Sequence, residues 1–112
     1  MATISNLYID QGTTFSTIVD VTDQQGFPLN LNGYTVAAQI RKSYQSSSSV
    51  NFVATVYGNP LDGKIQLELT PSTSSAMRAG RYLYDVEITN TGNSSKFRVL
   101  EGIVVLTPEI TR

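Results

Sequence analysis

Apolar residues alternate with polar ones in short runs along this chain, and turn-forming residues separate the runs. The clearest run covers 64–70, where Ile65, Leu67 and Leu69 share one face and Lys64, Gln66 and Glu68 share the other. A period of two is typical of a β-strand with one buried face. Runs of this kind predict seven strands, at 4–9, 14–23, 34–42, 51–57, 64–70, 81–89 and 96–107.

The segments between these runs carry turn chemistry. Asp62-Gly63 is a strong hairpin signal between the fourth and fifth predicted strands. The connector 27–31 contains two leucines, Leu29 and Leu31, whose side chains can pack into the hydrophobic core. The Ser-rich stretch 43–50 has the composition of a flexible linker and predicts a polar loop outside the core. In the last run Gly102 interrupts the alternation, which predicts a β-bulge.

Only 71–79 departs from the strand pattern. Thr70 can cap a helix, Pro71 suits its first position and Gly80 suits the position just after its end. We therefore expect one short helical turn here, with Ala76 and Met77 packing inward.

Seven strands at roughly ten-residue spacing predict an all-β fold, an immunoglobulin-like β-sandwich of antiparallel strands, with a small β-barrel as the alternative. No linker divides the chain, so 1–112 reads as one domain, with 109–112 as a C-terminal tail. The segment 79–86 resembles the tyrosine corner of such sandwiches. The predicted core consists of Phe15, Val19, Val36, Ile40, Ile65, Leu67, Leu69, Tyr82, Tyr84, Val86 and Ile88.

Composition removes many classes of activity. Eight basic and nine acidic residues give a net charge of -1, which argues against a nucleic-acid partner. Cysteine and histidine are absent, so disulfides, thiolate nucleophiles and His-based triads are excluded, and a metal could find only oxygen ligands. With no phosphate-binding glycine loop either, we expect no enzyme, no cofactor and no small-molecule substrate. No apolar run reaches the ~20 residues of a membrane span, and the first residues do not read as a signal peptide.

Two carboxylates, Asp85 and Glu87, lie two residues apart on one predicted strand. Such a pair could bind Ca²⁺ or act as acid and base. Because the opposite face carries core residues, we interpret both as solvent-exposed side chains that pair with Lys64, Lys96 or Arg98 across the sheet.

The order of motifs resembles a known family. The segments that carry the resemblance are 7–15, 21–41, 63–70, 79–86 and 101–108. Together they look like small virion proteins of tailed bacteriophages, particularly contractile-tailed phages of marine cyanobacteria, and are similar to the immunoglobulin-like N-terminal domain of phage baseplate upper proteins. The resemblance implies a multi-copy structural protein of the virion, in the tail or baseplate. It would be made in the host cytoplasm and held by contacts with copies of itself or with neighbouring virion proteins. Because the sequence stops at Arg112, the family's attachment of receptor-binding proteins is not carried over.

Two other roles remain open. One is a glycan-binding or host-adhesion module displayed on the virion, and the other is a capsid or neck decoration protein. A sugar platform needs exposed aromatic rings. The candidates are Tyr8, Tyr44 and Tyr57.

For a structural role, the candidate contacts are the sheet edges and the tail. Exposed edges either pair with a partner or must be protected, and we expect the first and last strands to dock. Ile110 lies beyond the strand-ending Pro108, so it and Arg112 are candidate partner contacts together with the three tyrosines.

Overall fold

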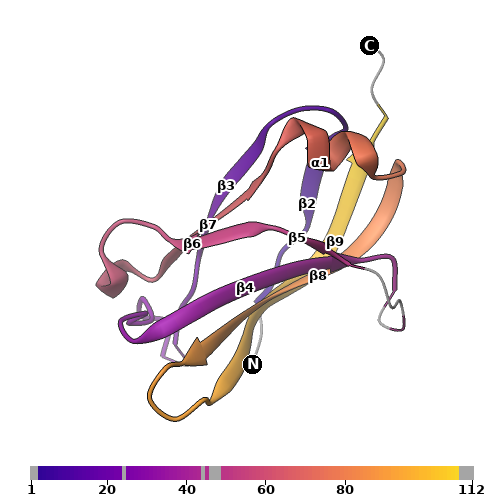
Figure 1. Cartoon of the computed structure of the whole chain (residues 1–112). Helices are drawn as coiled ribbons and strands as arrows, with labels where there is room; N and C mark the ends of the chain where they lie inside the picture. Colours follow the sequence, from indigo (N-terminus) through magenta and orange to yellow (C-terminus); the bar gives the residue numbers. More distant parts are fainter. Residues whose placement is uncertain (1–2, 24, 44, 46–48, 109–112) are drawn as a thin grey trace.

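The computed structural model describes residues 3–23, 25–43, 45 and 49–108, which form two packed β-sheets (Figure 1). The larger sheet has the order β1-β9-β8-β4-β5, with β2 also paired to β9, and the smaller sheet has the order β3-β7-β6. Their bounds are β1 Thr3–Ile4, β2 Leu7–Asp10, β3 Phe15–Asp20, β4 Tyr34–Arg41, β5 Val50–Asn51, β6 Val53–Val56, β7 Lys64–Leu69, β8 Gly80–Asn90 and β9 Lys96–Thr107.

The arrangement confirms the predicted immunoglobulin-like sandwich rather than a closed barrel. Strands β3, β7 and β6 form one antiparallel layer, and β4, β8 and β9 form the centre of the other. These are the two groups of central strands of an immunoglobulin domain. The prediction that all strands are antiparallel is wrong for the first strand, which pairs in parallel with β9 as two short pieces, β1 and β2. Strand β3 therefore lies at an edge of the smaller sheet.

The predicted core is confirmed. Most of its members are buried, and Phe15, Val19, Val36 and Tyr82 are half-buried side chains packed against it. The connector between β3 and β4 contributes as expected, with Leu31 buried and Leu29 partly buried. Period-two alternation thus identified the inward faces of both sheets correctly.

The predicted strand 51–57 is divided between the two sheets. Its start, in β5, pairs with β4, whereas β6 pairs with β7. The change occurs at Phe52, whose amide donates to the carbonyl of Ala38 at 3.0 Å. The Phe52 ring is buried and lies 6.2 Å from the Phe15 ring and 6.1 Å from the Tyr84 ring. Burial of this aromatic side chain between the layers fixes the place where the chain crosses.

The short helix α1, Pro71–Ala76, begins as predicted, with Thr70 as its cap. Two details of the prediction are wrong. Ala76 is exposed, and Ser74 takes the buried position, where its Oγ accepts from the Gly12 amide at 3.0 Å. Gly80 does not end the helix but starts β8. A second short turn, the 3-10 helix η1 (Pro60–Asp62), connects β6 to β7 at the predicted Asp-Gly signal.

The predicted tyrosine corner is present. Tyr82, near the start of β8, donates a hydrogen bond from its hydroxyl to the backbone carbonyl of Arg78. This bond ties the entry to β8 back to the segment that follows α1, at the end of the sandwich shown at the top of Figure 1.

The predicted bulge at Gly102 is wrong. Gly102 pairs in register with Tyr84, and the shift lies between Val86 and Glu87, opposite Leu100 and Arg98. Gly102 has a different role, because a Cβ there would lie only 2.0 Å from the carbonyl oxygen of Ser5. The backbone between β1 and β2 bends inward at this point, which only a glycine allows.

The inward bend places Ser5 above the Tyr84 side chain. The Tyr84 hydroxyl donates to the Ser5 carbonyl at 2.5 Å, and the Ser5 amide donates to the Glu101 carbonyl at 2.9 Å. Burial raises the pKa of Tyr84 above its ordinary value.

Candidate interaction face

The outer face of the larger sheet carries the most distinctive group of side chains. On β8 the inward residues alternate with outward ones, so Asp85 and Glu87 face away from the core. On β9 the bulge places Arg98 opposite Glu87 and Glu101 opposite Asp85. Two residues that lie three positions apart on a regular strand point to opposite faces of the sheet. The extra residue of the bulge brings both Arg98 and Glu101 to the outer face.

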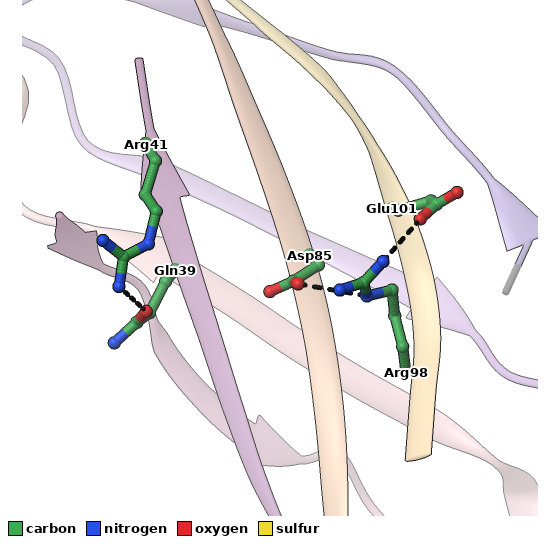
Figure 2. A network of polar contacts seen from close by, with 5 residues as sticks. All are labelled: Gln39, Arg41, Asp85, Arg98 and Glu101. Carbon is green, nitrogen blue, oxygen red and sulfur yellow. Dashed lines mark hydrogen bonds and ion pairs between the residues drawn. The ribbon is translucent and has the colours of Figure 1, made fainter. Parts of the chain in front are cut away.

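These side chains form an ion-pair network (Figure 2). Arg98 Nε lies 3.2 Å from Asp85 Oδ2, and its Nη1 lies 3.3 Å from Glu101 Oε2. On the adjacent strand, Arg41 Nη2 donates to Gln39 Oε1 at 3.1 Å. The Arg98 side chain remains 45% exposed, so each pair contributes little to stability, typically up to ~1 kcal/mol. The two pairs direct the Arg98 guanidinium toward Asp85 and Glu101 on the outer face.

A shallow hollow of about 190 Å³ lies over this network. Arg41, Leu83 and Glu87 line it together with the residues of the network. Pockets that enclose small-molecule ligands typically measure ~300–1,000 Å³. The hollow is therefore better suited to one side chain of a partner than to a whole ligand.

Beside the network lies a strip of apolar side chains with members on four strands, β1, β2, β9 and β8. Tyr8 on β2 pairs with Val105 on β9, and Ile103 on β9 pairs with Leu83 on β8. Ile4, at the end of β1, pairs with Glu101 and so joins the strip to the network. Tyr8 is 71% exposed and Ile4 73% exposed. We call Ile4, Tyr8, Leu83, Ile103 and Val105 the apolar strip.

The predicted ion pairs across the sheet are confirmed in part. Asp85 pairs with Arg98, one of the three basic residues proposed for it. Lys64 instead lies on the smaller sheet, where its Nζ is 2.6 Å from Asp20 Oδ1. That hydrogen bond and the Asp20 charge raise the pKa of Lys64.

The two predicted contact residues that the structure describes, Tyr8 and Tyr57, lie on different sheets. Tyr8 belongs to the apolar strip, whereas Tyr57 follows β6 on the other sheet and is 44% exposed. Tyr44, Ile110 and Arg112 lie outside the described residues.

The expectation for the sheet edges also needs correction. The last strand, β9, is not an edge over most of its length, because β8 pairs with one side of it and β1 and β2 with the other. The first strand, as β1 and β2, is an edge as expected.

Most of the apolar strip was not predicted from the sequence. The signal was present in the run Ile103-Val104-Val105-Leu106, where apolar residues occupy both faces of the strand. Val104 and Leu106 are buried, so Ile103 and Val105 supply an apolar outer face that a core alone does not require.

Within the described part of the chain, no group of three or more acidic side chains is placed to hold a metal ion. No helix in that part is long and apolar enough to cross a membrane.

Comparison with known proteins finds distant structural likenesses. No family model matches the chain, and no curated protein matches it. Among solved structures, InlP from Listeria monocytogenes is similar over 95% of this chain and 28% of its own, with 16% identity and a TM-score of 0.49. A family 123 glycoside hydrolase from Clostridium perfringens is similar over 97% of this chain and 24% of its own, with 9% identity and a TM-score of 0.44. The chain thus spans less than a third of either protein, and neither likeness bears on function.

Proposed function

We propose that this protein is a structural component of a multi-copy assembly and acts through protein–protein contacts made by the outer face of its larger sheet. The setting we propose is the phage virion, in the tail or baseplate, which the resemblance of the sequence to phage virion proteins implies. The observation that supports a contact role is the apolar strip. Its two most exposed members, Ile4 and Tyr8, leave large apolar side chains in water, and Ile4 lies opposite Glu101 of the charge network.

The strip has the composition of a protein contact. Interface centres are apolar and enriched in aromatic residues and arginine, and their rims are polar. Tyr8 and Val105 would form the centre, with Arg98 and Glu101 on the polar side. Burial of one large aliphatic side chain contributes about 1.5–3 kcal/mol, which becomes substantial when many identical contacts form. The partner that fits is a neighbouring subunit with an apolar patch and a side chain that enters the hollow above Arg98.

The test is incorporation of variants into particles. Tyr8→Ala is expected to lower the amount of protein in purified virions, measured by quantitative mass spectrometry. Tyr57→Ala removes an exposed tyrosine from the other sheet and serves as the matched control, with incorporation unchanged. Both variants should show the melting temperature of the natural protein.

Two results would contradict the proposal. Absence of the natural protein from purified virions would exclude the virion setting. Equal incorporation of Tyr8→Ala and Tyr57→Ala would exclude the apolar strip as the contact.

A further inference from the structure

Strand β3 presents an unpaired backbone edge. The Val21 amide, just after β3, donates to the Gly63 carbonyl at 2.7 Å, so this residue faces β7. Because backbone groups alternate along an antiparallel strand, the N–H and C=O groups of Ser16, Ile18 and Asp20 point away from β7. In the described residues, no strand pairs with that side of β3.

The edge has little of the usual protection against pairing. Natural edge strands are commonly blocked by charged side chains, lysine above all, by proline or by a bulge, and the only charge on β3 is that of Asp20. The sequence of β3 is Phe-Ser-Thr-Ile-Val-Asp, and it pairs with β7 in unbroken register over all six residues. Its inward side chains, Phe15 among them, are only half-buried, whereas Ile65 and Leu67 on β7 have no exposed area. An added strand would cover them.

We propose that β3 pairs antiparallel with β3 of a second copy of this chain, so that the two smaller sheets become one continuous sheet. The two-fold axis passes through Ile18. Ile18 then faces Ile18 of the other copy, and Ser16 faces Asp20 in two equivalent pairs. Each of these three facing pairs exchanges two backbone hydrogen bonds, since all their free groups point to the open edge.

The side chains favour this occupant over an unrelated strand. Strand β3 is self-complementary in this register. Ile18 lies opposite Ile18 of the other copy, and the Asp20 carboxylate lies opposite the Ser16 hydroxyl. No like charges lie directly opposite each other, an arrangement that would destabilise a sheet. Asp20 is in addition held by Lys64 at 2.6 Å, which leaves the shared edge nearly neutral.

The other edge of the smaller sheet is a poorer site. Strand β6 has only four residues, and the chain immediately before it crosses to β4 through the Phe52 amide. Strand β3 offers six residues with no such crossing.

This contact uses a surface different from that of the proposed function. The apolar strip lies on the larger sheet and β3 on the smaller one, so each contact can form or fail without the other. A multi-copy subunit could use both surfaces.

The test is self-association of the full chain, measured by sedimentation equilibrium and by NMR over a concentration series. An edge contact this small falls below the standard interface size, so we expect a weak dimer with a dissociation constant of roughly 0.1–1 mM. The amide signals of Ser16, Ile18 and Asp20 should shift with concentration. Tyr8→Ala should leave the dissociation constant unchanged, which separates this contact from the apolar strip.

Substitutions at one position give opposite results if the register is right. Ser16→Lys places a cation opposite Asp20 of the other copy and should tighten the dimer, whereas Ser16→Asp places two carboxylates opposite each other and should weaken it. With two equivalent pairs, each change is expected to be about 2- to 30-fold in the dissociation constant. Ile18→Lys brings two lysines together and should also weaken the dimer. Val53→Lys is the matched control, because it also replaces an exposed aliphatic side chain by lysine, but on β6. It should leave the dissociation constant unchanged.

A chain that stays monomeric at millimolar concentration would overturn the proposal. So would a dimer whose shifted amides lie outside β3, or Ser16→Lys and Ser16→Asp changing the dissociation constant in the same direction.

Discussion

Replacement of Gly102 by alanine tests how the first strand is attached to the sandwich. The added Cβ would lie 2.0 Å from the Ser5 carbonyl oxygen and 2.8 Å from its carbon. Both are backbone atoms, so no side-chain rotation relieves the contact, and the bend between β1 and β2 must move away from β9. We therefore expect Gly102→Ala to fold with its N-terminal strand partly detached.

The cost follows from the hydrogen bonds that this bend makes. They are Ser5 N–H to the Glu101 carbonyl at 2.9 Å, the Tyr84 hydroxyl to the Ser5 carbonyl at 2.5 Å and Ile103 N–H to Asn6 Oδ1 at 3.2 Å. At about 0.5–1.5 kcal/mol net for each, loss of all three destabilises the protein by roughly 1.5–4.5 kcal/mol.

Urea denaturation measures this loss as a change in the free energy of unfolding. Gly92→Ala is the matched control, because its added Cβ would meet only the side-chain oxygen of Asn90, at 3.2 Å in an exposed turn. Its effect should stay within about 0.5 kcal/mol, the range of ordinary surface changes. A Gly102→Ala protein as stable as Gly92→Ala would refute the close approach of Ser5 to β9.

Three further changes test the core and the two buried or half-buried tyrosines. Leu67→Ala should cost roughly 2–5 kcal/mol in urea denaturation, because Leu67 has no exposed area, and a cost below about 0.5 kcal/mol would show that its face is misassigned. Tyr82→Phe removes the bond to the Arg78 carbonyl and should lower the free energy of unfolding by about 1 kcal/mol, whereas an unchanged value would mean that the corner adds no stability. Burial raises the pKa of Tyr84 in the folded protein above 10.0. The contribution of this shift to the free energy of unfolding is therefore complete below pH 10.0 and is lost as the pH rises through the folded-state pKa. Melting temperatures measured from pH 8 upward should fall above about pH 10, and Tyr84→Phe should fall less steeply.

Much of the fold could be predicted from local patterns in the sequence. The alternation around Leu67 gave the inward faces, the Asp62-Gly63 signal gave the β6–β7 connection, and Thr70 with Pro71 gave the start of α1. These features depend on backbone geometry and capping within a few residues, so a short window of sequence contains the relevant information.

The errors came where contacts between strands decide the structure. Gly102 looked like a bulge because glycine weakens a strand, but its reason is the Ser5 carbonyl, 97 positions away in the sequence. The actual bulge, opposite Val86 and Glu87, follows from pairing between β8 and β9. The break at Phe52 depends on an aromatic contact between the layers.

The sequence by itself determined that this is a β-sandwich, which of its strand faces are buried, and how its local turns and caps are made. The tertiary structure alone decided which strands have free edges and which outward residues lie together. Tyr8 and Val105 become neighbours only because the first strand pairs in parallel with the last. That same pairing removes the first strand from the smaller sheet and leaves β3 uncovered. Alternation fixes which way a side chain points within one strand, but it contains no information on which strand lies beside it, and that choice is made by the packing of the whole chain.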